Sequence, residues 1–132
     1  MQFKIPFFDV DAYRVVWHGN YPKYIEMARC NLLDKAGCPY SVMEEEGFFF
    51  PIVDIQLKYV KPLFFEQEVQ LDAWFVEWRN RLKINYEIRD CSDNTVYSKA
   101  KTTQFAVAMP ERITQFESPP FLVDKISAWL DD

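Results

Sequence analysis

The feature that most constrains the fold is a change in hydrophobic spacing about a third of the way along the chain. Pro22 suits a first helical turn, Asn20 is a candidate N-cap, and Gly37 is a candidate C-terminal cap, so a helix is predicted over residues 21–36. Beyond residue 50 the pattern alternates between apolar and polar residues, which is typical of strands. The helical face is formed by Tyr24, Ile25, Ala28, Leu32 and Ala36.

The alternating part of the chain predicts four long strands. They cover residues 53–59, 69–75, 82–88 and 95–109. Shorter elements are predicted as a strand at residues 2–8 and as helices at 39–46 and 121–130. Small side chains at Ser98, Ala100 and Thr102 share one strand face, where a helix is expected to lie close to the sheet. This order of elements predicts an α+β fold in which an antiparallel sheet wraps around one long helix.

Composition limits the classes of function. The 132 residues are 49% apolar with only 3 glycines, which predicts one globular domain over residues 1–132. The 12 Phe, 7 Tyr and 4 Trp exceed the needs of one small core, so we expect an oligomer, a homodimer or homotetramer, or an apolar ligand channel. The net charge of −5, without a basic run, makes nucleic acid a poor candidate partner.

The cysteines and the apolar runs also exclude several classes. Cys30, Cys38 and Cys91 match neither a zinc spacing nor a CxxC motif, so free thiols and no metal site are expected. No stretch is apolar over the ~18 residues of a membrane span, and Asp9 comes too early for a secretory h-region. We therefore expect a cytoplasmic protein.

The segment DVDAYRVVWHGNY, residues 9–21, carries the residues best suited to chemistry. Two acids and the only histidine lead directly into the predicted helix. The start of a helix offers unpaired N–H groups and the positive end of the helix dipole, so it can hold a polarised carbonyl within reach of a carboxylate. This arrangement indicates an acyl-transfer site.

The same segment resembles the signature of hotdog-fold thioesterases of the 4-hydroxybenzoyl-CoA thioesterase group. The resemblance continues in residues 56–62 and 77–81 and in the order of elements across nearly the whole chain. It implies a hotdog fold and hydrolysis of an acyl-CoA or aryl-CoA, with no metal or redox cofactor and with coenzyme A as part of the substrate. The matching residues are Asp9, Asp11, Val15, His18, Asn20 and Tyr21.

The resemblance also implies roles for single residues. Asp11 is the implied catalytic carboxylate, either as a general base on water or as a nucleophile, and both roles suit a thioester with its good leaving group. His18 is expected to orient substrate or water, or to be a structural hydrogen-bonding residue. The backbone N–H groups of Asn20 and Tyr21, and those just following, are expected to polarise the thioester carbonyl. Asp9 is expected to be a turn or strand-end residue with at most a supporting role.

Several basic residues are candidates for substrate binding. Arg79 and Arg81 flank a predicted turn whose counterpart in the family meets the phosphates of coenzyme A, although a solvated loop is the alternative. Lys58 and Lys61 are weaker candidates. Arg14 stands where the family usually has glycine, so it either holds Asp11 ionised, selects an anionic acyl group or blocks the pocket.

Alternative functions remain open from the sequence. The same chemistry on acyl carrier protein would need a basic docking patch, and a noncatalytic hotdog module could bind an acyl thioester or a partner protein. A dehydratase acting on hydroxyacyl thioesters is a further hotdog activity, but the two acids before the helix favour hydrolysis. Candidates for an acyl channel, with core packing as their alternative use, are Tyr24, Phe48, Phe49, Phe50 and Trp74.

Overall fold

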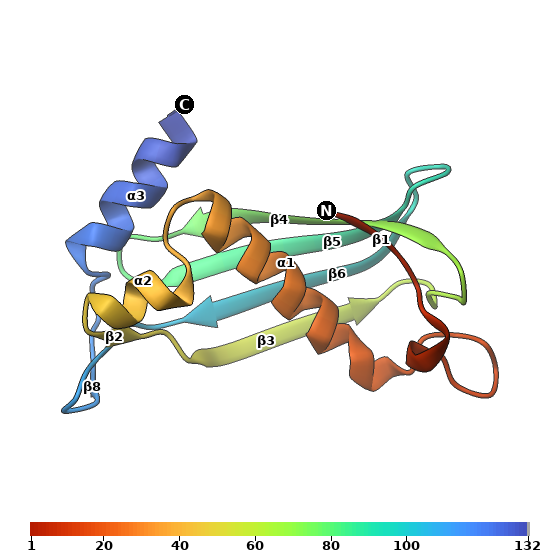
Figure 1. Ribbon diagram of the computed structural model, residues 1–132, viewed down its shortest axis with the longest axis horizontal. Helices are drawn as coiled ribbons and strands as arrows, with labels where there is room; N and C mark the ends of the chain where they lie inside the picture. Colours follow the sequence, from red (N-terminus) through yellow and green to blue (C-terminus); the bar gives the residue numbers. More distant parts are fainter. Residues whose placement is uncertain (132) are drawn as a thin grey trace.

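Helix α1 (Tyr21–Lys35) lies across one face of a five-stranded antiparallel sheet in the computed structural model, which describes residues 1–131 (Figure 1). The strand order is β1-β4-β5-β6-β3, and every neighbouring pair is antiparallel. The α+β prediction, a sheet around one long helix, is therefore confirmed. The strands are β1 (Gln2–Lys4), β3 (Ile52–Tyr59), β4 (Glu68–Glu77), β5 (Leu82–Asp90) and β6 (Val96–Gln104).

The two ends of α1 are closed in different ways. Gly37 has φ +81°, and the amide of Cys38 donates to Leu33 O at 2.9 Å, so the predicted glycine cap is confirmed. At the other end the predicted side-chain cap from Asn20 is wrong. The short 3-10 helix η2 (His18–Asn20) runs straight into α1, which gives Asn20 a helical backbone. Its Nδ2 donates instead to Asp9 O at 2.8 Å.

The core lies between α1 and the sheet. Ser98, Ala100 and Thr102 are all buried on the face of β6 that lies under the helix, which confirms the prediction from their small size. Small side chains there let the helix come close, and burial of the surrounding apolar groups stabilises the fold by about 25 cal/mol per Å² removed from water. The helix contributes Tyr24, Ile25, Ala28, Leu32 and Leu33 to this core.

Two predicted strands end earlier than expected. The strand at residues 2–8 stops at Lys4, and a 3-10 turn, η1 (Phe7–Asp9), follows Pro6, whose nitrogen cannot donate to a strand ladder. The strand at 95–109 ends at Gln104. The chain then enters a small second sheet of β2 (Phe48–Phe49), β7 (Val107–Ala108) and β8 (Ile113–Thr114).

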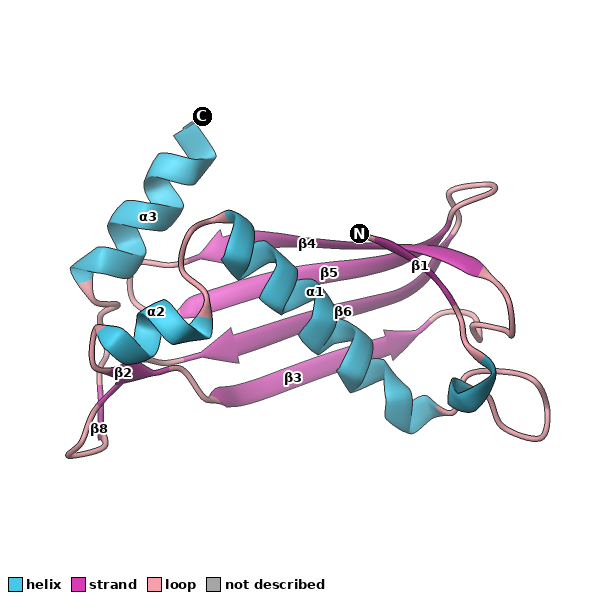
Figure 2. Cartoon of the chain, viewed as in Figure 1, coloured by secondary structure: helices cyan, strands magenta, loops and turns pink. Residues whose placement is uncertain are grey.

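Two further helices complete the described chain, and both lie at the end of the sheet away from the start of α1 (Figure 2). They are α2 (Tyr40–Glu45) and α3 (Pro120–Asp131), close to the predicted ranges. Within residues 1–131, none of the helices has the length and apolarity needed to cross a bilayer.

Strand β3 forms an open edge of the sheet. All of its residues except Leu57 are exposed, and its helix-side face presents Val53, Ile55 and Tyr59 to solvent. An exposed eight-residue edge strand with one apolar face is a template for pairing with another strand. The predicted contact with a second subunit stays a prediction, and β3 is the edge that fits it.

Candidate active site

The loop between η1 and η2 folds back on itself, so that its two arms pair with each other. The pair Val10 and Val16 forms an isolated bridge, and the amide of Asp11 donates to Val15 O at 2.9 Å. The amide of Arg14 donates to Asp11 O at 2.9 Å, which closes a reverse turn. Asp11 is thus held at the start of the turn that forms the tip of the loop, to the right of α1 in Figure 1.

Arg14 adopts the left-handed conformation with φ +65°. A non-glycine residue in this conformation costs on the order of 1 kcal/mol. The Arg14 guanidinium carbon lies 5.5 Å from the centre of the Phe65 ring. Among the residues that the structure describes, it forms no ion pair with Asp11, although both side chains border the same cavity.

Asp11 combines a fixed backbone with a partly exposed carboxylate. Its Oδ1 accepts a hydrogen bond from the amide of Tyr13 at 2.8 Å, as in an Asx turn. The carboxylate borders a cavity of about 370 Å³, which Phe7, Val10 and Phe65 also line. A carboxylate in an apolar-walled cavity, with one oxygen oriented by a backbone donor, is suited to attack a carbonyl or to activate water.

Asp9 has a different environment from Asp11. It is buried, its Oδ1 accepts from Lys23 Nζ at 2.6 Å, and its Oδ2 accepts from the hydroxyl of Tyr24 at 2.7 Å. Burial and the Asp9 carboxylate both raise the pKa of Tyr24, so the phenol remains a donor. The backbone oxygen of Asp9 also accepts from the amide of Trp17 at 3.0 Å. Asp9 therefore fastens the loop to the first turns of α1.

The backbone amides at the start of α1 are not all available to a ligand. The Asn20 amide donates to Trp17 O at 2.9 Å, and the Tyr21 amide donates to His18 O, so these two expected donors are already paired inside the chain. The 3-10 geometry of η2 causes this, because it closes each bond one residue earlier than an α-helix does. In residues 1–131 the amides of His18 and Gly19 donate to no backbone carbonyl.

His18 and Gly19 lie under the ring of Trp17. The rings of Trp17 and His18 have centroids 5.3 Å apart, and His18 is exposed. A Cβ atom at Gly19 would lie 2.3 Å from the Trp17 ring, so glycine permits this close approach. The His18 carbonyl accepts from the hydroxyl of Tyr59 at 3.3 Å, which links η2 to the end of β3.

Arg79 and Arg81 lie at the opposite end of the sheet from Asp11 within one chain. They occupy the β4–β5 turn, whereas the Asp11 loop adjoins the far end of the sheet (Figure 1). Arg81 Nε pairs with Glu77 at 3.1 Å, and Arg79 O accepts from the amide of Ser118 at 2.8 Å. One chain alone does not bring these arginines to the Asp11 loop.

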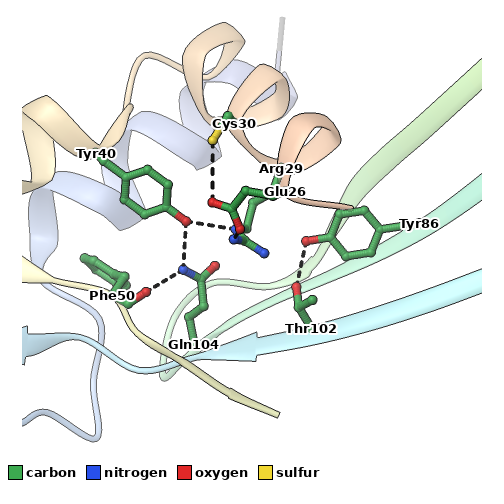
Figure 3. A network of polar contacts seen from close by, with 8 residues as sticks. All are labelled: Glu26, Arg29, Cys30, Tyr40, Phe50, Tyr86, Thr102 and Gln104. Carbon is green, nitrogen blue, oxygen red and sulfur yellow. Dashed lines mark hydrogen bonds and ion pairs between the residues drawn. The ribbon is translucent and has the colours of Figure 1, made fainter. Parts of the chain in front are cut away.

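A second polar cluster lies under the latter half of α1, and sequence analysis did not identify it (Figure 3). The buried Arg29 pairs with Glu26 and donates from Nε to the hydroxyl of Tyr40 at 2.8 Å. Gln104 Nε2 donates to the same hydroxyl at 3.2 Å and to Phe50 O at 2.6 Å. The available signal was a polar residue on the apolar stripe, because Arg29 lies four residues after Ile25.

The aromatic residues that are candidates for an acyl channel do not all lie together in the structure. Phe48, Phe49 and Phe50 line an apolar pocket of about 560 Å³, which Tyr40 borders from the polar cluster. Trp74 lies on the face of β4 that points away from α1, so it cannot line a channel beneath the helix. Residues 1–131 contain no group of three His, Cys, Asp or Glu side chains arranged to bind a metal ion.

Comparison with known proteins identifies the family. The family model described as "Thioesterase-like superfamily" matches residues 5–130. The chain belongs to the thioesterase-like superfamily. The Bacillus subtilis protein named "Putative acyl-CoA thioesterase YneP" is 28% identical over 129 residues, which cover 88% of this chain and 93% of that protein. An Aquifex aeolicus protein named "Putative esterase" is 31% identical and covers 75% of this chain and 77% of its own length.

Solved structures of other proteins show the same architecture. A hypothetical protein from Thermus thermophilus superposes with a TM-score of 0.85 at 25% identity, over 98% of this chain and 97% of that one. A 4-hydroxybenzoyl-CoA thioesterase variant complexed with 4-hydroxybenzoyl-CoA superposes with a TM-score of 0.82 at 21% identity, over 96% of each chain. The hotdog fold implied by residues 9–21 is therefore confirmed.

Proposed function

We propose that this member of the thioesterase-like superfamily hydrolyses an acyl-CoA or aryl-CoA thioester at the Asp11 loop. The observation that carries the proposal is the contrast between the two acids of the loop. Asp9 has both carboxylate oxygens engaged inside the protein, whereas Asp11 borders a cavity with its Oδ2 outside the Asx turn. The Bacillus subtilis relative is named a putative acyl-CoA thioesterase. A Pseudomonas protein that is 29% identical over 84 residues is named "4-hydroxybenzoyl-CoA thioesterase", and both names support the substrate class.

The reaction needs one carboxylate, one water molecule and donors for the carbonyl oxygen. Asp11 either removes a proton from water as water adds to the carbonyl carbon, or adds itself and forms an anhydride that water then cleaves. In both routes a C–O bond forms, the C–S bond breaks, and the products are a carboxylic acid and the free thiol of coenzyme A. We assign no metal or redox cofactor to this reaction.

The amides of His18 and Gly19 are the donors proposed for the carbonyl oxygen. They replace those of Asn20 and Tyr21, which are paired within the chain. Each well-placed donor is worth about 3 kcal/mol in the barrier. The exposed His18 ring is proposed to orient substrate or water, and Arg14 is proposed to limit the cavity beside Asp11.

A second copy of the chain is proposed to complete the site through the β3 edge. Antiparallel pairing of two β3 strands places the Ile52 end of one strand beside the Tyr59 end of the other. The aromatic pocket of Phe48, Phe49 and Phe50 and the turn with Arg79 and Arg81 lie at the Ile52 end, whereas the Asp11 loop adjoins the Tyr59 end. The pairing would thus bring an apolar pocket and two arginines toward Asp11.

Coenzyme A is preferred to acyl carrier protein as the carrier of the acyl group. The net charge of −5 disfavours docking of an acidic protein, and two arginines suit the phosphates of a nucleotide. We place the protein in the cytoplasm, because its three cysteines are free thiols, as expected in a reducing compartment.

The test measures thiol release from a panel of aryl-CoA and fatty acyl-CoA substrates and from acylated carrier protein. Wild type is expected to turn over at least one CoA substrate. Asp11→Asn is expected to lower kcat by a factor of about 10²–10⁴ while unfolding at the wild-type temperature. Equal background rates for wild type and Asp11→Asn on every substrate would refute hydrolysis and support a noncatalytic binding module. Faster turnover of the acylated carrier protein would show that acyl carrier protein, rather than coenzyme A, is the preferred carrier of the acyl group.

A further inference from the structure

The outer face of the sheet, opposite α1, carries a hollow of about 510 Å³, within the ~300–1,000 Å³ range of small-molecule sites. Strand register sets two rows of side chains across it. One row runs from Trp74 through Asn85 and Lys101 to Gln56. The next row runs from Asp72 through Glu87 and Lys99 to Lys58.

Three lysines in this hollow form no ion pair within the described chain. None of the ion pairs of the described chain includes Lys58, Lys99 or Lys101. Glu87, the acid opposite Lys99, pairs instead with Arg89. The result is a local cluster of positive charge on a chain whose net charge is −5.

Lys58 and Lys99 stand directly opposite each other on β3 and β6. Like charges in that position destabilise a sheet by a few tenths of a kcal/mol up to about 1 kcal/mol. A bound anion between them would reverse the sign of this interaction. The pairing is therefore better explained by an anionic ligand than by the stability of the sheet.

Trp74 adds a flat apolar surface beside the lysines. Its side chain belongs to the same hollow, and 41% of the residue is exposed. An exposed indole beside ammonium groups matches a ligand with a planar ring attached to phosphates, because rings stack on indole and lysines bind phosphate as point charges. The amide side chains of Gln56 and Asn85 offer donors and acceptors between them.

We propose that this outer-face hollow binds a nucleotide, with the ring on Trp74 and the phosphates on Lys58, Lys99 and Lys101. The hollow lies on the other side of the sheet from α1 and is distinct from the Asp11 cavity. The proposal stands without the hydrolase proposal, because binding is measured in the absence of turnover. The nucleotide comes either from a free nucleoside phosphate or from the nucleotide half of coenzyme A. In the second case Lys58, Lys99 and Lys101, rather than Arg79 and Arg81, hold the phosphates of coenzyme A.

The experiment measures binding of ADP, coenzyme A and inorganic pyrophosphate to the full chain by calorimetry. ADP is expected to bind, and the double variant Lys99→Gln/Lys101→Gln is expected to weaken it about tenfold or more. Trp74→Leu is expected to weaken ADP about tenfold and leave pyrophosphate unchanged. The matched control is Lys83→Gln on the same face of β5. Lys83 lies opposite Glu77 and outside the hollow, so ADP affinity is expected to stay within about twofold.

The binding results distinguish a free nucleotide from the nucleotide half of coenzyme A, and two results would overturn the proposal. Binding of coenzyme A that is tighter than ADP and equally sensitive to the lysine variants assigns the hollow to the nucleotide half of coenzyme A. Binding of ADP alone assigns it to a free nucleotide. Absence of lysine-dependent binding of either ligand overturns the proposal. A wild-type oligomer that dissociates in the lysine double variant also overturns it, because the face would then be covered by a second copy.

Discussion

Asp9 of η1, which is bonded to the first turn of α1, and Arg29, in the second half of α1, are buried charges of opposite sign with similar surroundings. The Asp9 side chain is 5% exposed and pairs with Lys23, which is 46% exposed. The Arg29 side chain is 3% exposed and pairs with Glu26, which is 52% exposed. Each buried charge also contacts a tyrosine hydroxyl, from Tyr24 or Tyr40.

The two clusters differ in what they hold. The Asp9 cluster fastens a loop that lies beyond the end of the sheet and presents Asp11 to a cavity. The Arg29 cluster lies inside the fold and joins α1 to Tyr40 of α2 and, through that hydroxyl, to Gln104 of β6 (Figure 3). The same arrangement therefore occurs in two roles. A buried charge that contacts a tyrosine hydroxyl and pairs with a half-exposed opposite charge holds a reactive loop in one cluster and a contact between helices in the other.

Raising the pH is expected to have the largest effect, and it acts on both clusters. Burial is the largest cause of the raised pKa of Tyr21, Tyr24 and Tyr86, and burial raises the pKa of Cys38 to about 11. The unfolded chain loses these protons from about pH 9–10, but the fold retains them to higher pH. The contribution of these buried protonated groups to the unfolding free energy is complete below about pH 9. It falls as pH rises, by about 1.4 kcal/mol per pH unit for each group.

The measurement is urea unfolding at a series of pH values above neutrality. Tyr24 belongs to the Asp9 cluster, and the Tyr86 hydroxyl lies beside Arg29, 2.7 Å from the hydroxyl of Thr102 (Figure 3). Tyr24→Phe and Tyr86→Phe are each expected to reduce the fall of the unfolding free energy with rising pH. An unfolding free energy that does not change up to about pH 11 would contradict the burial of these groups.

Asp9→Ala is expected to cost about 3 kcal/mol of unfolding free energy, because it leaves the buried Tyr24 hydroxyl without its acceptor and removes the Lys23 pair. The matched variant Asp11→Ala removes a carboxylate bound only to the Tyr13 amide, so a loss of about 0.5–1 kcal/mol is expected. Thermal and urea unfolding of the two variants measure this difference. Similar losses from both would remove the distinction between an anchoring and a reactive acid.

The sequence predicted most of the fold because hydrophobic spacing records burial on a helix or strand. It identified α1, the four long strands and the small residues of β6 beneath the helix. The resemblance marked residue 14 as a position where the family usually has glycine, and the turn has positive φ there. It could not show that η2 would occupy the amides of Asn20 and Tyr21, since a 3-10 turn and an α-helical turn have similar side-chain patterns. It also missed the Arg29 cluster, which depends on contacts between distant segments.

Gln104→Leu is expected to cost about 2 kcal/mol, because it leaves the carbonyl of Phe50 without the donor that lies 2.6 Å away. The control is Tyr40→Phe. That variant removes the hydroxyl that accepts from both Gln104 and Arg29, but it leaves the Phe50 bond and the pair of Arg29 with Glu26, so its cost is expected to be about 1 kcal/mol. Urea unfolding measures both. A larger loss from Tyr40→Phe would show that the hydroxyl, rather than the Gln104 amide, holds the cluster together.

The smallest change in unfolding free energy is expected at Arg14, whose backbone has the left-handed conformation. Arg14→Gly removes about 1 kcal/mol of left-handed strain, but it also removes the contact with Phe65 and makes the unfolded chain more flexible, so these changes nearly cancel. Arg14→Val cannot adopt φ +65° easily and is expected to lose about 1–2 kcal/mol. If valine were tolerated as well as glycine, the turn would not require positive φ. The strain would then lie elsewhere in the loop, and the position of Asp11 would not depend on residue 14.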